Sequence, residues 1–194
     1  SSALFYNKVT LLETGVLTST VLNPYASKES TFYNAFYISI RDAANNEIIK
    51  YESSAEEPST SFNTGLAAGE YYVCLSPLYS FSQDYRTVTY SLSFEADPNT
   101  ETEPNNKAAD ATALMLDSMY HGYTDGSTKD YFSIDLVQDN KYRISLDAES
   151  LSDFYIIDPA TGAEKCKFVS GVGPEGCPFV EYTAPATGKY YLYP

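Results

Sequence analysis

Residues 131–136 are Tyr131-Phe132-Ser133-Ile134-Asp135-Leu136, a run in which apolar and polar side chains alternate. This period of two is typical of a β-strand with one buried face. The same period occurs in Tyr37-Ile38-Ser39-Ile40, in Tyr90-Ser91-Leu92-Ser93-Phe94 and in Tyr142-Arg143-Ile144-Ser145-Leu146. Gly, Pro, Asn and Asp separate these runs, which indicates an all-β antiparallel sandwich. The segment 107–115 has helical character, and Asn105 or Asn106 is placed to cap a short turn before it.

Two short motifs occur twice at almost the same separation. Phe36-Tyr37-Ile38 recurs 118 residues later as Phe154-Tyr155-Ile156. Gly69-Glu70-Tyr71-Tyr72 recurs 119 residues later as Gly188-Lys189-Tyr190-Tyr191. Two colinear matches indicate a tandem repeat. We therefore predict two sandwich domains, residues 1–97 and 98–194, joined at the polar segment 97–100.

The two copies are incomplete at different places. The first has no counterpart of the segment from Glu101 to about Ser118, and the second has no counterpart of the strand 90–94. One explanation is that the boundaries of the fragment cut through both copies or that the first copy has diverged. The other is that a neighbouring molecule supplies the missing strand, so that chains associate through their edge strands.

The charge of the chain excludes several classes of partner. The net charge is −14, whereas nucleic acids and anionic membrane surfaces attract basic proteins. No apolar run approaches the roughly 20 residues of a membrane-spanning helix, so we expect no membrane insertion. The acidic character suits an exported protein that binds cations, although a solvated acidic surface explains the charge as well.

Catalytic motifs are missing from the sequence. The one histidine, His121, precedes Gly122 in a predicted turn, and neither an HExxH helix nor a G-x-S-x-G elbow is present. No glycine-rich stretch has the strand-to-helix context of a phosphate-binding loop. We therefore expect a protein that is not an enzyme.

Three cysteines allow one disulfide. Cys166 and Cys177 flank a turn-rich stretch and would lie opposite each other in a hairpin centred between Gly171 and Val172. Opposed antiparallel positions lie within disulfide reach, at roughly 4.5–5.5 Å. The alternative is two free thiols. Cys74 has the pattern of a small buried apolar residue.

The most specific stretch is Glu101-Thr102-Glu103-Pro104-Asn105-Asn106-Lys107-Ala108-Ala109-Asp110-Ala111-Thr112. Together with residues 125–134 and 188–192, it resembles the bacterial pre-peptidase C-terminal domain family, which is related to the collagen-binding domains of clostridial collagenases. The resemblance spans nearly all of residues 101–194, and in the first copy only residues 36–95 match.

This resemblance implies a jelly-roll-like β-sandwich that does no chemistry and accompanies exported bacterial hydrolases. The expected function is that of an accessory module, secreted or at the cell surface, that contacts extracellular protein or polysaccharide. The alternative is a structural subunit of an extracellular assembly that exchanges strands between incomplete sandwiches.

The resemblance also implies a calcium site in the second copy. Calcium prefers six to eight oxygen ligands, which residues on nearby loops can supply. Asn106 and Ser127 stand where calcium-binding members carry aspartate, and Asp125 is close enough in sequence to compensate. Alternatively, Asn105 and Asn106 cap a turn and Asp130 accepts backbone hydrogen bonds. The candidate ligands are Glu101, Glu103, Asn105, Asn106, Tyr123 through its backbone oxygen, Asp125, Ser127 and Asp130.

Collagen binding does not carry over from the resemblance, because the collagenase modules use a tryptophan and this chain has none. Tyr79, Phe81 and Tyr85 follow the Gly-x-Tyr-Tyr strand of the first copy. They form a candidate aromatic patch for a polymer chain, although an ordinary sandwich rim explains them equally well.

Overall fold

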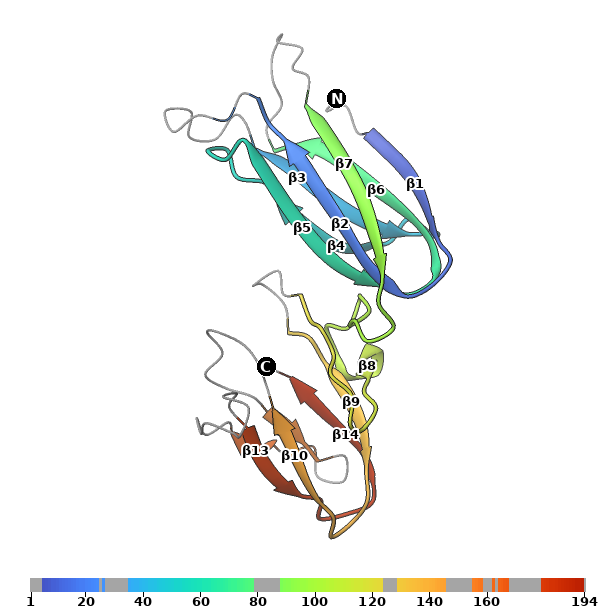
Figure 1. Ribbon diagram of the computed structural model, residues 1–194, viewed down its shortest axis with the longest axis vertical. Coiled ribbons are helices and arrows are strands. Elements are labelled where there is room, and N and C mark those ends of the chain that lie inside the picture. The colour runs from blue at the N-terminus through green and yellow to red at the C-terminus, as the bar shows by residue number, and fades with distance from the viewer. Residues whose placement is uncertain are drawn as a thin grey trace. The chain divides into compact units, whose positions relative to one another are not determined.

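The computed structural model describes residues 5–24, 26, 35–78, 88–123, 129–145, 155–158, 162, 164–167 and 179–193, with backbone alone for 164–167. The chain forms two compact units. The first consists of residues 1–104 and 120–125, and the second of residues 105–119 and 126–194. As predicted, the described residues are almost entirely β-structure (Figure 1). No helix among them is long and apolar enough to cross a membrane.

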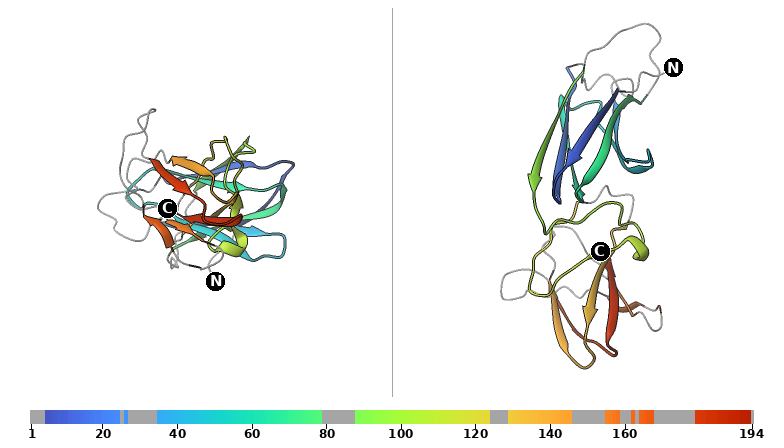
Figure 2. Two further views of the ribbon diagram at one scale, coloured as in Figure 1. Left: turned by 90° about the horizontal axis from the view of Figure 1, so that it is seen from below. Right: turned by 90° about the vertical axis from the view of Figure 1, so that its right-hand side faces the viewer.

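The described residues of the first unit form seven strands. They are β1 (Phe5–Leu11), β2 (Gly15–Leu22), β3 (Phe36–Asp42), β4 (Glu47–Glu52), β5 (Ser59–Leu66), β6 (Gly69–Pro77) and β7 (Thr89–Ala96). One sheet has the order β1-β6-β3-β4 and the other the order β5-β2-β7, with every neighbouring pair antiparallel. The two sheets lie as separate layers of a β-sandwich (Figure 2).

The core of this sandwich follows from the alternation of its strands. Leu17 and Val21 of β2 face the four-stranded sheet and are 1% exposed, while Thr18 and Thr20 face outward. Ile40 of β3, fully buried, belongs to the same core cluster. The alternation of side chains in a strand therefore sorts residues between core and solvent as the sequence pattern predicts.

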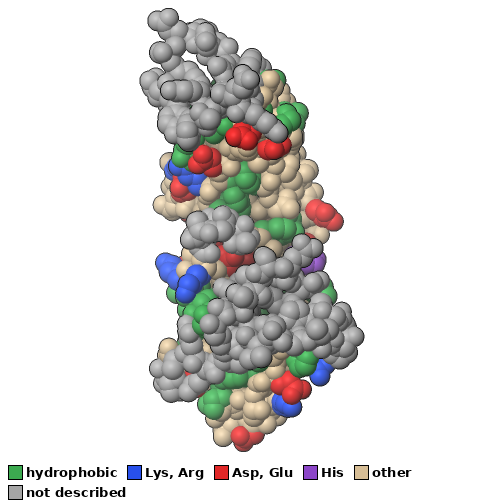
Figure 3. All heavy atoms as spheres, turned by 90° about the vertical axis from the view of Figure 1, so that its left-hand side faces the viewer, with side chains coloured by type: hydrophobic (Ala, Val, Ile, Leu, Met, Phe, Trp, Pro, Cys, Tyr) green, Lys and Arg blue, Asp and Glu red, His purple; other side chains and the backbone are tan. Residues whose placement is uncertain are grey.

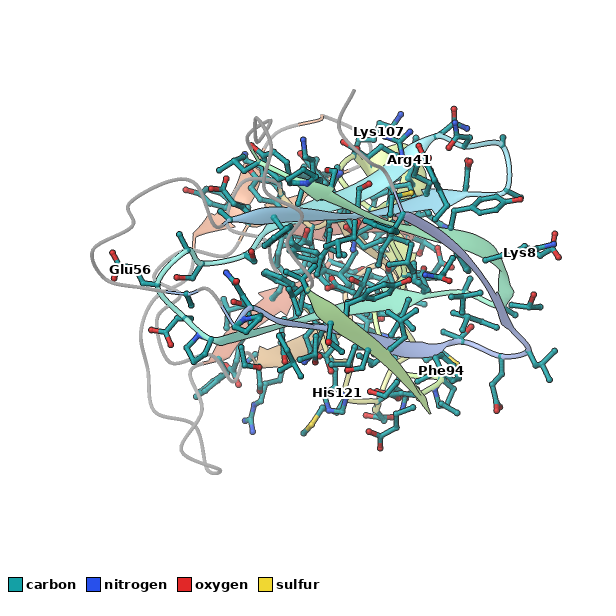
Figure 4. All side chains as sticks on the ribbon, turned by 90° about the horizontal axis from the view of Figure 1, so that it is seen from above. Lys8, Arg41, Glu56, Phe94, Lys107 and His121 are labelled. Atoms are coloured by element: carbon teal, nitrogen blue, oxygen red, sulfur yellow. The ribbon has the colours of Figure 1, made fainter. Side chains whose placement is uncertain are left out.

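The outward face of the four-stranded sheet is polar. Lys8 of β1 pairs with Glu70 at 2.5 Å, and Arg41 of β3 pairs with Glu47 at 3.1 Å (Figure 4). Cys74 is buried, as expected, but it is not part of the core cluster, because its neighbours Val73 and Leu75 face the core instead. Burial raises the pKa of its thiol.

In the second unit, the part of the chain that the structure describes forms seven strands and a short 3₁₀ turn. The strands are β8 (Thr112–Ala113), β9 (Phe132–Leu136), β10 (Lys141–Ser145), β11 (Tyr155–Ile157), β12 (Glu164–Lys167), β13 (Phe179–Thr183) and β14 (Gly188–Tyr193), and the turn is η1 (Ala108–Asp110). One sheet has the order β12-β11-β14-β9-β8, and β10 pairs with β13 in the other. Side chains of both sheets pack around the buried Ile156 and Tyr190.

The larger sheets of the two units share one strand order. The order β9-β14-β11-β12 corresponds to β1-β6-β3-β4. The register corresponds as well, since Leu11 pairs with Gly69 in the first unit and Leu136 with Gly188 in the second. The residues described in the second unit include no counterpart of β7, the strand whose sequence pattern the second copy lacks.

The expected helical turn over residues 107–115 is only partly present. Helical structure is limited to the three residues of η1, and no side chain caps it. Thr112 and Ala113 form β8, which pairs in parallel with β9. The prediction was wrong beyond Asp110 because pairing with β9 outweighs the helical preference of the alanines.

Candidate metal centre

The polar segment 97–100, predicted as a linker, is held by hydrogen bonds. Asp97 donates its backbone N–H to Thr14 O at 3.1 Å and accepts the N–H of Thr100 at 3.3 Å. Its carboxylate also accepts the N–H of Asn99 at 2.9 Å, which is the geometry of an Asx turn. This turn fixes the direction in which the chain enters residues 101–103.

His121 holds the next part of the segment through its backbone. Its carbonyl accepts the N–H of Glu101 at 2.8 Å, its N–H donates to Asn99 O at 2.9 Å, and it bridges Thr100 in a parallel sense. Its ring Nδ1 lies 2.8 Å from the Asp97 carboxylate. The hydrogen bond with His121, and then that from the Asn99 N–H, lowers the pKa of Asp97.

Three acidic side chains of this region come together. Carboxylate oxygens of Glu101, Glu103 and Asp130 all lie within 4.8 Å of one another. The three residues are buried, with exposed fractions of 0%, 7% and 5% respectively. This cluster, called the acidic triad below, consists of three residues that the sequence predicts as metal ligands.

The spacing of the acidic triad fits one calcium ion. Two oxygens that bind the same calcium at about 2.4 Å lie no more than about 4.8 Å apart. Three carboxylates supply up to six oxygens of the hard type that calcium prefers. Two carboxylates about 4.8 Å apart repel by roughly 3.5 kcal/mol at an effective dielectric constant of about 20. A divalent cation would relieve that repulsion, so the donor set and the charge both suit such an ion.

The other described candidates differ in their positions. Tyr123 donates its backbone N–H to the Glu101 carboxylate, so its N–H orients a member of the triad. Asn105 is fully buried, and its backbone carbonyl accepts the backbone N–H of Tyr131 at 2.8 Å. Asn106 is exposed. Burial is the main cause that raises the pKa of the Tyr123 phenol.

Several predicted positions lie outside the described residues. Among metal candidates these are Asp125 and Ser127, and the aromatic candidates Tyr79, Phe81 and Tyr85 also fall there. The predicted disulfide between Cys166 and Cys177 also lies outside the described residues. The backbone of Cys166 in β12 pairs with Ile156, but its side chain and the whole of Cys177 are not described. These expectations remain predictions.

Sequence reasoning missed the residues that hold the triad in place. His121 was assigned to an exposed turn, and its side chain is exposed, but its backbone fixes Glu101. Gly65 of β5 accepts the N–H of Glu103 at 3.0 Å and was not singled out. Both contacts join residues distant in sequence, so no local pattern announces them.

On the face drawn in Figure 3, the acidic side chains of the described residues are scattered among polar and apolar surface. Exposed acidic groups of this kind explain much of the net charge without a ligand. The acidic triad differs from them because its three side chains are buried and their oxygens lie within 4.8 Å of one another.

Comparisons with known proteins identify no family for this chain. No family model matches it, and no curated protein matches it. Among solved structures it has a weak likeness to the crystal structure of the protein YhaK from Escherichia coli. The identity is 12%, the alignment covers 99% of this chain and 79% of that one, and the TM-score is 0.21.

Proposed function

We propose that this chain is a non-catalytic accessory module of a secreted or cell-surface bacterial protein, stabilised by calcium, that contacts extracellular protein or polysaccharide. The acidic triad is the observation that supports this proposal most directly, because Glu101, Glu103 and Asp130 are all buried and their oxygens fit the span of one calcium ion. The proposed role of the calcium ion is structural. The ion would fix the segment 101–103 and stabilise the fold that presents the binding surface.

The proposal predicts a calcium-dependent rise in melting temperature. Calcium at 100 times its Kd adds about 2.7 kcal/mol to stability. For a unit of this size, that energy raises the Tm by roughly 10 °C or more. The measurement is thermal unfolding of the full chain in chelator and in calcium, with magnesium as a second ion. Magnesium should give a smaller shift because it requires a tighter octahedral site.

Glu103→Gln tests whether the triad is responsible. The substitution keeps the shape of the side chain and removes one of the three carboxylates that lie within 4.8 Å of one another. We expect the Tm in chelator to stay level or rise, since repulsion is relieved, and the calcium-induced shift to fall to less than a third. Glu13→Gln, at an exposed position, should leave the shift unchanged. An equal calcium shift in Glu103→Gln and the unaltered chain would contradict the proposal, as would no shift at all.

The second candidate is a structural subunit that associates through strand edges. It is favoured by β1, which lies at the edge of its sheet and carries the exposed aromatics Phe5 and Tyr6, 58% and 51% exposed. Exposed strand edges are sites where further strands add. Light scattering on the same samples separates the two candidates. A monomer at every concentration supports the accessory module, and a concentration-dependent oligomer supports the subunit.

A further inference from the structure

Gly65 stands at a position of β5 where the strand meets another segment of backbone. It pairs with Val16 of β2, and its neighbour Leu66 belongs to the core, so Gly65 faces outward. Of the outward-facing residues along β2, Val16 is 8% exposed although Leu22 is 44% exposed. This end of the outer face is therefore covered. A glycine within a strand often marks such a close approach of another backbone.

The segment that covers Gly65 contains Thr100 and Glu101, the first glutamate of the acidic triad. A Cβ built on Gly65 would lie 2.0 Å from the backbone oxygen of Glu101 and 2.9 Å from the Thr100 hydroxyl. Real Cβ contacts are essentially never shorter than 3.0 Å. The close partner is a backbone carbonyl, which cannot rotate away as a flexible side chain would. Residues 100 and 101 can lie on β5 only because this position has no side chain.

Gly65 also fixes the second glutamate of the triad. Its carbonyl accepts the N–H of Glu103 at 3.0 Å. Among the described strands β5 lies at the edge of its sheet, so none of them pairs with it on its outer side. The open edge of the sheet therefore anchors the metal-binding segment directly, two residues beyond the contact with Glu101.

We propose that Gly65 is a positioning residue for the calcium site, which it sets in place before the metal binds. The inference rests on the proposed function above and extends it to a residue 36 positions before Glu101 in sequence. The absent side chain places Glu101, the carbonyl places Glu103, and His121 and Tyr123 complete the hold on Glu101. Preorganisation of this kind raises affinity, because less ordering remains to be done on binding.

The size of the displacement decides the effect of a substitution. In Gly65→Ala, the Glu101 oxygen must move from 2.0 Å to at least 3.0 Å from the new Cβ. Calcium–oxygen distances span only about 2.3–2.6 Å, so a shift of that size in the backbone misplaces the carboxylates. We therefore expect calcium to bind at least tenfold more weakly to Gly65→Ala.

Gly15→Ala is the matched control. Gly15 lies on β2 next to Val16, and its Cβ would lie 2.2 Å from the Glu95 backbone oxygen and 2.6 Å from the Phe94 ring. The atoms nearest to the new Cβ belong to Phe94 and Glu95 of β7 and not to residues 100–103, so the clash strains the same sheet at another place. We expect Gly15→Ala to lower the Tm in chelator and to keep the calcium Kd within about twofold, as measured by calorimetric titration of the full chain.

Amide hydrogen exchange of the unaltered chain provides a measurement that needs no variant. In chelator, the Glu103 amide should exchange at least tenfold more slowly than an unstructured amide, because it already donates a hydrogen bond to the Gly65 carbonyl.

Fast exchange of the Glu103 amide, or equal calcium Kd values for folded Gly65→Ala and the unaltered chain, would overturn the inference. If the unaltered chain binds no calcium, the proposed function fails first; if it binds and Gly65→Ala binds equally well, only the role of Gly65 fails. Should Gly65→Ala not fold, the exchange of Glu103 decides.

Discussion

At the scale of single residues, one hydrogen bond recurs in both units. Tyr71 donates its hydroxyl to Ala67 O at 2.9 Å, and Tyr190 donates to Ala186 O at 2.7 Å. Each tyrosine closes the turn that leads into its own strand by bonding four residues back, similar to the tyrosine corner of other sandwiches. The recurring Gly-x-Tyr-Tyr motif therefore has a physical basis: the first tyrosine fastens the turn, and in the first unit a Cβ on Gly69 would lie only 3.3 Å from the Tyr71 ring.

Removing these hydroxyls should destabilise the two units unequally. Tyr190 also accepts the Ala186 N–H at 3.2 Å, so its loss leaves two backbone groups without that partner. We expect Tyr190→Phe to lower the free energy of unfolding by about 1–2 kcal/mol and Tyr71→Phe by about 1 kcal/mol, as measured by urea unfolding. Tyr37→Phe, on the outward face beneath Lys50, serves as the control. Unchanged stability of Tyr190→Phe would show that the bond contributes nothing.

The sequence identified the acidic triad but not the residues that position it. The resemblance of residues 101–112 and 125–134 to a known family pointed to Glu101, Glu103 and Asp130 as candidate ligands. Asn106 is exposed, and its role as a ligand remains a prediction. Gly65 acts through a contact formed only when β5 and the segment 100–103 come together in the fold.

At the scale of elements, the connection from β3 to β4 is held by one carboxylate. Asp42 accepts the N–H of Asn46 at 2.8 Å and its side-chain amide at 2.8 Å, while Asn45 has a φ of 68°. The left-handed conformation suits asparagine better than most residues. The hydrogen bonds from the Asn46 side chain and then from its backbone lower the pKa of Asp42.

This turn should give a pH-dependent effect of known sign. Because the pKa of Asp42 is lower in the folded state, its contribution to stability is complete above the unfolded pKa and is lost as pH falls through the folded pKa. Asp42→Asn should therefore lower the Tm at pH 7, and the gap to the unaltered chain should close in strongly acidic buffer. Asp117→Asn, away from this turn, is the control. A gap that stays constant with pH would contradict the assignment.

Strands were predictable and their partners were not. The alternating runs at residues 37–40, 90–94 and 131–136 fall within β3, β7 and β9, with Tyr131 just before its strand. Alternation is a property of one strand, so it is legible in the sequence. The parallel pairing of β8 with β9 depends on a contact across about 20 residues, and the local alanine-rich composition indicated a helix instead.

At the scale of the whole molecule, the described residues form two separate core clusters. The described core of the first unit includes Ile38, Ile40 and Leu75, and that of the second includes Ile156, Tyr190 and Leu192. The two clusters have no residue in common. A hydrophobic core acts as one cooperative block, so two cores make two blocks that open with their own free energies.

A matched pair of core substitutions tests this separation. Ile40 and Ile156 are both 0% exposed and lie on corresponding strands of their sheets. Each change to alanine removes buried apolar atoms and leaves a cavity, which typically costs about 2–5 kcal/mol. Ile40→Ala should speed the slow amide exchange of β3 and β6 and leave β9 and β14 unchanged, whereas Ile156→Ala should do the reverse, as read by hydrogen exchange with mass spectrometry. Equal acceleration in both sets of strands from either variant would mean that the chain unfolds as a single block.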